Sequence, residues 1–451
     1  MPDTETPVYA VLLAGGVGSR LWPVSRDLSP KQLVKFFGRD SLIQATVKRI
    51  LPVTAADNIR IVCGQEHRDE ITRHLQEIGI AAGNRIICEP CGRNTAPAIL
   101  LAVLKILQLE KEAVLCVFPA DHVIKNAAVF RDRLRSAIGL ADTGYVVTFG
   151  MTPHYPETGY GYIEGGDDVS GGALITKRFL EKPDLVTARR YLEAGNFFWN
   201  SGMFAFRASI ILEEFKRYQP DLLHQMTEID LSGEQVEAAD YIRLPDISID
   251  YAIMERTGKG AVLPSDLGWS DIGSWKALYE FLPKDKDNNV IDGDVIAQET
   301  RNCFIMSHGR LIASNHLDNL VIVETPDAIF VSDIDTSRNV KSIVARLKGT
   351  NRTETIRHRA TVHAWGSLTV LDRRKGGDVA RLIIRPDAVC HRVAEQVCSL
   401  TVLEGTGRIG EIEVKSGSTF AAAAGEVLQV ENRGRESMVV IQVALSQHEK
   451  R

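Results

Sequence analysis

Short apolar runs alternate with segments of helical spacing through the first third of the chain. The apolar runs, four to seven residues long and typical of strands buried in a parallel sheet, occupy residues 8–14, 59–63, 85–88, 113–118 and 145–149. The segments with helix patterns occupy residues 41–51, 67–78, 97–109 and 127–141. This alternation indicates a doubly wound α/β sheet. Ligands of such sheets bind beyond the carboxyl ends of the strands, so residues that follow these runs are the first functional candidates.

The pattern changes near residue 288. From there, short β-prone runs recur every roughly 8 to 12 residues between polar turns, which indicates an all-β module, either a short β-helix or a meander. The basic segment 346–359 has the composition of a linker, and the short strands of 379–443 fit a β-barrel. We therefore predict an α/β domain at 1–287, a small β module at 288–345 and a barrel at 360–451.

A glycine-rich loop follows the first apolar run. Gly15, Gly16 and Gly18 carry no Cβ to keep backbone N–H groups away from an anion, and positive φ angles can turn successive N–H groups toward it. Arg20 and Lys31 would neutralise phosphate charge. For the glycines alone, an ordinary strand-to-helix turn is the simpler explanation. The loop lacks both the end of a Walker loop and the spacing of a dinucleotide-binding motif.

Two aspartates lie at positions where a metal could be held. Asp121 directly follows the fourth apolar run and is expected at the same sheet edge as the glycine loop. It would be either a Mg²⁺ ligand beside substrate phosphates or the N-cap of the next helix. Asp271, flanked by small residues, is either a second metal carboxylate or a cap.

Several later residues have the chemistry of sugar recognition. Residues 159–164 combine flexible glycines with two tyrosines that can close over a sugar, or they form a plain hairpin strand. Asn200, in an aromatic stretch, can both donate and accept, as recognition of a hydroxyl requires. Glu181 could accept sugar hydroxyls while Lys182 meets a phosphate, unless the two are merely exposed charges at a strand end.

Composition excludes several classes of partner. A chain of 451 residues implies two or three domains, and a net charge of −5 without basic blocks gives no reason to expect nucleic acid. No apolar run approaches the roughly 20 residues of a membrane span. The polar, acidic start of the chain is unlike a signal peptide, so we expect a cytoplasmic protein. Seven cysteines, several in predicted strands, indicate unbridged thiols.

The motifs together resemble one family. They are, in order, AGGVGSRLWPVSR at 14–26, PKQ at 30–32, EPCGRNTAP at 89–97, FPADH at 118–122, EKP at 181–183, NSGM at 200–203 and WSDIGSW at 269–275. The series resembles mannose-1-phosphate guanylyltransferase, in the long bacterial form fused to a type II phosphomannose isomerase domain. The resemblance implies a Rossmann-like nucleotidyltransferase fold for residues 1–287.

The reaction that the resemblance implies joins GTP and mannose 1-phosphate into GDP-mannose and pyrophosphate. The sugar-phosphate oxygen attacks the α-phosphorus in line, so the protein supplies positioning and charge neutralisation and no covalent nucleophile. Gly15, Gly16 and Gly18 with Arg20 would cradle the triphosphate. Lys31 would stabilise charge at the α-phosphate.

The remaining implied roles concern the cofactor, the nucleoside and the sugar. Asp121 and Asp271 would hold Mg²⁺, the expected cofactor, with Asp121 counted among the catalytic residues. The segment that would contact the nucleoside contains Glu89, Arg93, Asn94 and Thr95. The residues that would bind the sugar phosphate are Gly161, Glu181 and Asn200 for the hydroxyls, Lys182 for the phosphate, and Asp250 as a further candidate nearby.

The C-terminal third departs from the family pattern. The HAWGS motif at 363–367 resembles the Arg-Pro-Trp-Gly-Ser opening of the isomerase domain, with its first two residues replaced. Segment 393–399 lacks the expected histidine cluster, and Leu428 stands where a later histidine is expected. His391 and Glu395 alone fall short of a catalytic zinc site. We therefore predict a degenerate cupin-like barrel at 360–451, without isomerase activity, that serves assembly or stability.

Two other interpretations stay open. The chain could be a nucleotidyltransferase for another sugar 1-phosphate or another nucleotide. From a different class, it could be a catalytically silent, sugar-nucleotide-binding regulatory subunit, against which the presence of Lys31, Asp121 and Asp271 counts. We expect a homo-oligomer, in the simplest case a dimer, with GTP and mannose 1-phosphate as its partners and neither nucleic acid nor a membrane.

Overall fold

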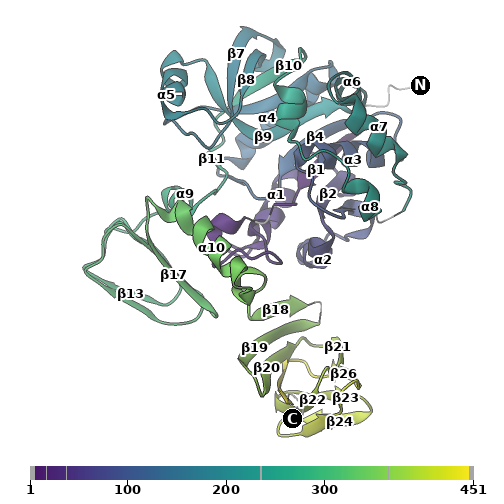
Figure 1. Ribbon diagram of the computed structural model, residues 1–451, viewed down its shortest axis with the longest axis vertical. Helices are drawn as coiled ribbons and strands as arrows, with labels where there is room; N and C mark the ends of the chain where they lie inside the picture. The colour runs from purple at the N-terminus through teal and green to yellow at the C-terminus, as the bar shows by residue number, and fades with distance from the viewer. Residues whose placement is uncertain (1–5, 17, 37, 234–235, 364, 446–451) are drawn as a thin grey trace. The chain divides into compact units, whose positions relative to one another are not determined.

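The computed structural model describes residues 6–16, 18–36, 38–233, 236–363 and 365–445 (Figure 1). The first five residues of the polar N-terminus, residue 17 of the glycine loop and residue 364 of the HAWGS motif lie outside the described residues. The chain divides into two compact units, Met1–Lys284 with Ile334–Lys341, and Asp285–Asp333 with Ser342–Arg451. The three-domain boundaries stay a prediction. One short segment, Ile334–Lys341, groups with the α/β part and not with the β module that was predicted to contain it.

The first unit is built on a nine-stranded sheet. Its strand order is β3-β2-β1-β4-β9-β6-β10-β8-β7. The strands are β1 (Val8–Leu13), β2 (Ile59–Gly64), β3 (Ile86–Glu89), β4 (Val114–Pro119), β6 (Val146–Met151), β7 (Tyr162–Asp168), β8 (Leu174–Leu180), β9 (Phe197–Arg207) and β10 (Gly260–Ser265). The pairs β1–β2, β2–β3, β1–β4 and β6–β10 are parallel, whereas β9 runs antiparallel between β4 and β6. The predicted doubly wound α/β fold is confirmed.

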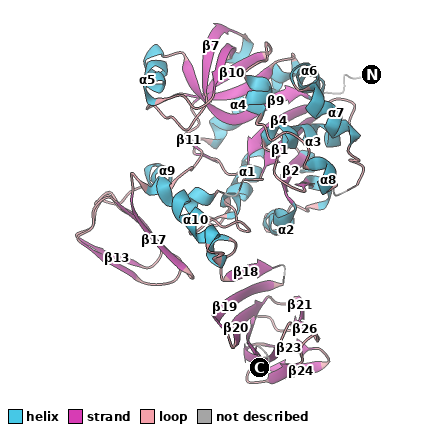
Figure 2. Cartoon of the chain, in the orientation of Figure 1, coloured by secondary structure: helices cyan, strands magenta, loops and turns pink. Residues whose placement is uncertain are grey.

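Helices flank this sheet (Figure 2). The helices of the first unit are α1 (Leu42–Ile50), α2 (Arg68–Gln76), α3 (Thr95–Leu107), α4 (Ala127–Asp142), α5 (Leu185–Ala194), α6 (Ala208–Tyr218), α7 (Pro220–Glu228), α8 (Ala238–Tyr241) and α9 (Trp275–Phe281). Because side chains of a strand alternate between its faces, Ala10 and Leu12 of β1 join the core with α1, α2 and α4. Tyr9 and Val11 join the core with α3, α6 and α7.

Two strand pairings position the candidate site. In the register of β1 and β4, Leu13 lies opposite Pro119, so the glycine loop and residue 121 leave the sheet at the same edge. A two-stranded ribbon of β5 (Val123–Ile124) and β11 (Trp269–Ser270) pairs Ser270 with Val123. This ribbon carries residue 271 back to the same edge, although it is far from residue 121 in the sequence.

The β module contains parallel pairings. β12 (Val290–Asp292), β14 (Phe304–Ser307) and β16 (Leu320–Thr325) pair in parallel, as do β13 (Val295–Gln298) and β15 (Ile312–Asn315). β17 (Ala328–Asp333) closes the larger sheet in antiparallel orientation. A meander would pair successive strands antiparallel throughout, so of the two predicted alternatives the β-helix is the one observed.

The segment predicted as a linker, 346–359, begins inside a helix. Helix α10 spans Val340–Gly349, and its last turn contains the basic residues Arg346 and Lys348. Cations in the last turn of a helix interact favourably with its dipole, which explains why basic residues there continue the helix.

The C-terminal part is an antiparallel barrel of two sheets. Its strands are β18 (Ala360–His363), β19 (Gly366–Arg374), β20 (Gly377–Ile384), β21 (Val389–Val393), β22 (Val397–Glu404), β23 (Thr406–Ile409), β24 (Ile412–Lys415), β25 (Thr419–Ala422), β26 (Val427–Asn432) and β27 (Met438–Leu445). The sheet orders are β18-β19-β20-β27-β22-β25 and β21-β26-β23-β24. Apolar side chains, including Leu382, Leu400, Leu428 and Val430, fill the space between them.

Across the described residues, each helix is too short or too polar to cross a bilayer.

Candidate active site

The glycine loop is closed against Lys31. Gly18 has φ 67°, and a Cβ at this position would lie 2.5 Å from the Cβ of Lys31. The loop is held by two side chains: the Ser25 hydroxyl donates to the Gly18 carbonyl at 2.7 Å, and the Gln32 amide donates to the Ala14 carbonyl at 2.6 Å. Only glycine combines this left-handed backbone with so close an approach. Gly18 therefore lets the loop lie directly over the lysine.

The Lys31 ammonium joins the two predicted metal ligands. Lys31, 5% exposed, has its Nζ 2.9 Å from Oδ2 of Asp121 and donates to the backbone carbonyl of Asp271. Burial alone would raise the pKa of the Asp121 carboxyl, but the neighbouring ammonium holds it below the ordinary value. The structure thus brings together Lys31, Asp121 and Asp271, which the sequence analysis could connect only through a resemblance.

The Asp271 carboxylate is oriented by neighbours of its own. Its Oδ1 accepts from the Tyr160 hydroxyl at 2.8 Å and from the Gly273 N–H at 3.0 Å. The Tyr160 ring packs edge-on against Trp199 and Trp269, with centroids 5.4 and 5.3 Å away. Burial, followed by the charge of Asp271, raises the pKa of Tyr160, which stays protonated and can donate. The sequence indicated this tyrosine only as a cover for a sugar, and its bond to Asp271 becomes visible in the fold.

His122 has a structural partner. The Trp269 indole N–H donates to Nδ1 of His122 at 3.2 Å, and burial lowers the pKa of the imidazole. A neutral ring that accepts from an indole holds the β5–β11 ribbon against the end of β4.

The glycine loop, Lys31 and the two aspartates line one pocket of about 280 Å³. Its lining residues include Gly18, Arg20, Lys31, Asp121 and Asp271. Arg20 is exposed at its rim. The pocket therefore combines backbone of the glycine loop, cations and two carboxylates, which is the composition of a site for a polyphosphate with a divalent cation.

The predicted sugar residues form a second cluster. The Asn200 amide donates to Oδ1 of Asp250 at 2.9 Å, and the Asn200 N–H donates to the Gly161 carbonyl at 2.8 Å. A Cβ at Gly161 would lie 2.5 Å from Oε2 of Glu181, so only glycine lets that carboxylate approach. Burial and then the Glu181 charge raise the pKa of Asp250 to about 6. Lys182 extends outward, 58% exposed at its side chain, and pairs with Glu181.

The predicted nucleoside segment begins with a buried carboxyl. Glu89, at the end of β3, is 5% exposed and accepts from the Tyr241 hydroxyl at 2.7 Å. Burial raises the pKa of Glu89 to about 7. A Cβ at Gly15 would lie 3.6 Å from Oε2 of Glu89, so this carboxyl borders the glycine loop.

The rest of this segment holds the chain between Tyr241 and Asp250. Arg93 donates to the Ile242 carbonyl, and the Thr95 hydroxyl accepts from the Ile249 N–H at 2.8 Å. Asn94, at φ 65°, caps α3 by accepting from the Thr95 N–H at 2.9 Å. The stretch of chain at 241–250 therefore links the carboxyl beside the glycine loop to the sugar cluster. No local signal in the sequence indicated this link.

The fold and site define a class of protein. Residues 9–288 match the nucleotidyl transferase family, and residues 293–347 match a mannose-phosphate isomerase/GMP-like β-helix domain. The chain is thus a nucleotidyltransferase, an enzyme whose substrates are a nucleotide and a sugar phosphate.

Individual relatives cover nearly the whole chain. It is 38% identical to a mannose-1-phosphate guanylyltransferase of Klebsiella pneumoniae over 96% of this chain and 95% of that protein. It is 40% identical to a mannose-1-phosphate guanylyltransferase of Escherichia coli over 88% of this chain and 87% of that protein. A crystal structure of mannose-1-phosphate geranyltransferase from Thermus thermophilus superposes with a TM-score of 0.69 at 32% identity, covering 76% of this chain and 99% of that one. The chain belongs to the mannose-1-phosphate guanylyltransferase family.

Proposed function

We propose that this protein transfers a guanylyl group from GTP to mannose 1-phosphate and releases pyrophosphate. The observation that carries the proposal is the meeting, at one sheet edge, of the loop over Lys31 with Asp121 and Asp271. Motifs of the α/β domain supply this edge, the sugar cluster and the segment of Glu89 beside it. The relatives at 38–40% identity support the choice of nucleotide and sugar.

The residues of the pocket account for the charge changes of the reaction. As the sugar-phosphate oxygen attacks the α-phosphorus, negative charge builds on that phosphate and on the leaving pyrophosphate. The buried Lys31 ammonium is already positioned by Asp121 and would stabilise this charge without reorganising. Arg20 and the backbone of the glycine loop would hold the remaining phosphates.

Mg²⁺ fits the same residues. Lys31 contacts the carboxylate of Asp121 and the backbone carbonyl of Asp271, so both aspartates border the position of one cation, which supports this proposal. Mg²⁺ is commonly held by one or two carboxylates together with substrate phosphates, and we propose Asp121 and Asp271 as those carboxylates. Bound there, the ion would neutralise phosphate charge.

The second cluster would position mannose 1-phosphate. Asn200 and Glu181 can bond to sugar hydroxyls, and the exposed Lys182 can turn toward the phosphate. Glu89 and the neighbouring glycine loop border the space that we assign to the guanine base. The stretch 241–250 contacts both Glu89 of the nucleoside segment and Asn200 of the sugar cluster. It would therefore fix the position of the nucleoside relative to the sugar.

A panel assay tests the proposal. Purified full-length protein is given each of several nucleoside triphosphates with each of several sugar 1-phosphates, and pyrophosphate release is measured with and without Mg²⁺. We expect release with GTP and mannose 1-phosphate that requires the metal. Release with another pair would favour the alternative nucleotidyltransferase, and no release from folded protein would favour the regulatory subunit.

We infer that the C-terminal barrel does not isomerise sugars. Leu428 is 4% exposed and packs in the barrel core, where the resemblance expects a metal-binding histidine. His391 and Glu395 are exposed. With mannose 6-phosphate and Zn²⁺ we therefore expect no fructose 6-phosphate, and its formation would contradict the inference.

Two further expectations remain proposals. All seven cysteines are unbridged, which supports a reducing compartment and hence the cytoplasm. A homodimer stays a prediction that light scattering of the full chain would test.

A further inference from the structure

The chain returns to the catalytic unit after the β-helix. β17 ends at Asp333, and the next eight residues, Ile334–Lys341, group with the α/β sheet and not with the strands that precede them. Ile334 is 3% exposed and Val340 is 1% exposed, so both ends of this segment are fixed by burial. The segment ends in the first residues of helix α10.

Two ion pairs attach this returning segment. Arg338 donates to both oxygens of Glu157, at 3.3 and 3.0 Å, and the Glu157 side chain is 7% exposed. The Asp335 carboxylate accepts from Lys276 at 2.6 Å. A two-pronged arginine contact to a nearly buried carboxylate is the stronger kind of ion pair. The segment is therefore held in a defined place on the catalytic unit.

The attachment point is adjacent to the metal carboxylate. Oε1 of Glu157 also accepts from the Gly159 N–H at 2.8 Å, and the next residue, Tyr160, donates to Asp271. The loop that orients Asp271 and the returning segment thus share one buried carboxylate.

Lys341, the last residue of the segment, lines the polyphosphate pocket. Of the described residues that line this pocket, Arg20, Lys31 and Lys341 are cations, and Asp121 and Asp271 are carboxylates. Lys31 is paired with Asp121. Without Lys341, the positive charges of Arg20 and Lys31 would balance the negative charges of Asp121 and Asp271. Lys341 therefore gives these lining residues a net positive charge, which favours binding of a triphosphate.

The side of the pocket indicates which phosphates Lys341 meets. Glu181, Asn200 and Asp250 of the sugar cluster are not among the residues that line this pocket, whereas Gly18 and Arg20 of the glycine loop are. In an in-line transfer the attacking and leaving groups lie on opposite sides of the α-phosphorus. A lysine on the side away from the sugar therefore faces the leaving group.

We propose that Lys341 binds the β- and γ-phosphates of the nucleotide and the pyrophosphate that they become, an inference that rests on the proposed guanylyl transfer. The active site then consists of the α/β domain and a segment that follows the β-helix. Lys341 is a substrate-binding residue, and Arg338 with Glu157 is a positioning pair.

The experiment measures the reaction in both directions with Lys341→Gln, Lys341→Arg and, as a control, Lys216→Gln, which changes an exposed lysine of α6. For Lys341→Gln we expect the KM for pyrophosphate in the reverse reaction to rise about tenfold. The KM for GTP in the forward reaction should rise by the same factor. This is the loss of affinity expected from removing one charge-assisted contact. The KM for mannose 1-phosphate and the Tm should stay unchanged. Lys341→Arg should retain most of the affinity, and Lys216→Gln should match the wild type.

Two outcomes separate this inference from the function on which it rests. Unchanged KM values for pyrophosphate and GTP in Lys341→Gln, with an active wild type, would overturn the assignment of Lys341. If the wild type forms no GDP-mannose, the proposed function is wrong, and calorimetric titration of the full chain with inorganic pyrophosphate still decides whether Lys341 binds it. Equal affinities in wild type and Lys341→Gln would then reject the site.

Discussion

In the candidate site, the single positive charge of Lys31 serves two aspartates. The Lys31 ammonium bonds to Asp121 and to the Asp271 backbone, so one lysine holds both aspartates. In the proposed reaction the same ammonium would also stabilise charge at the α-phosphate. We therefore expect Lys31 both to orient the two aspartates and to stabilise the charge that develops during the reaction.

Replacing Lys31 by alanine should affect turnover more than binding. Charge at the α-phosphorus grows toward the transition state, so we expect kcat to fall by about 100-fold. The KM for mannose 1-phosphate should change little, because the sugar cluster does not contain Lys31. Steady-state pyrophosphate release measures both constants. Lys35→Ala, which changes an exposed lysine that pairs with Glu77, is the matched control and should leave both unchanged.

Asp250 is expected to cost stability at neutral pH. Its pKa is about 6 in the folded chain against 3.8 ordinarily, so the unfolded chain loses this proton first as pH rises. Folding is therefore penalised increasingly between pH 4 and 6, by at most about 3 kcal/mol above that range. Asp250→Asn should raise the free energy of unfolding at pH 8, leave it unchanged near pH 3.5, and weaken mannose 1-phosphate binding.

Urea unfolding at the two pH values checks this expectation. Asp246→Asn, which changes an exposed neighbour in the same segment, should show no such pH-dependent gain. Equal gains for Asp250→Asn at both pH values would show that the effect does not come from ionisation.

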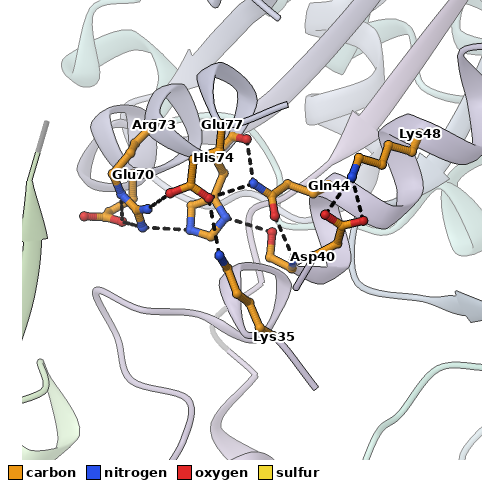
Figure 3. A network of polar contacts seen from close by, with 9 residues as sticks. Lys35, Asp40, Gln44, Lys48, Glu70, Arg73, His74 and Glu77 are labelled. Carbon is orange, nitrogen blue, oxygen red and sulfur yellow. Dashed lines mark hydrogen bonds and ion pairs between the residues drawn. The ribbon is translucent and has the colours of Figure 1, made fainter. Parts of the chain in front are cut away.

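At the scale of elements, α1 and α2 are joined by a buried polar network (Figure 3). The Gln44 amide donates to the His74 carbonyl at 2.8 Å and to Glu77 at 3.0 Å, and Nδ1 of His74 lies 2.8 Å from the Ser41 hydroxyl. Gln44 also caps its own helix by accepting from the Ser41 N–H at 2.8 Å. The helix predicted over 41–51 is thus observed as α1, and the Gln44 side chain that caps it also connects it to α2.

His74 should make this helix pair sensitive to acid. Burial, and then the charge of Arg73, lower its pKa to about 4 from 6.5. Between these values the unfolded chain binds a proton that the folded chain does not, so stability falls as pH drops from 6.5 to 4, by about 3 kcal/mol for this group. In His74→Asn, the free energy of unfolding should therefore decrease by about 3 kcal/mol less between pH 7 and pH 4 than in the wild type. Urea unfolding at the two pH values measures this difference. His224→Asn, which changes an exposed histidine, should leave the loss as in the wild type.

At the scale of the whole molecule, the catalytic unit is discontinuous in sequence. It needs residues on both sides of the β-helix strands, because Ile334–Lys341 returns to it. A chain that stops before this segment leaves the nearly buried Glu157 without its arginine, and an unpaired buried charge is costly.

Two truncations follow from this topology. A chain that ends at residue 350 should keep its Tm and its pyrophosphate release, since both parts of the catalytic unit are present. A chain that ends at residue 287 should unfold at a lower temperature and lose activity. Thermal unfolding and the pyrophosphate assay compare the two. Full activity of the shorter chain would show that the returning segment is dispensable.

The sequence by itself determined the order of elements and the family. Strands and helices form where local apolar spacing demands it, so β1 to β4 and α1 to α4 appear within a few residues of the predicted bounds. The family motifs are likewise short, continuous strings. Patterns of this kind can be recognised without knowledge of the fold because they depend on residues near one another in the chain.

Only the tertiary structure decided which side chains meet. Lys31 bonds to a residue 240 positions away, Tyr241 to one 152 positions away and Arg338 to one 181 positions away. No local spacing encodes such contacts, since they depend on which strand ends share a sheet edge and on where the chain returns. The sequence therefore predicted a phosphate loop with two candidate carboxylates, and the fold showed that Lys31 links them and that Lys341 borders the same pocket.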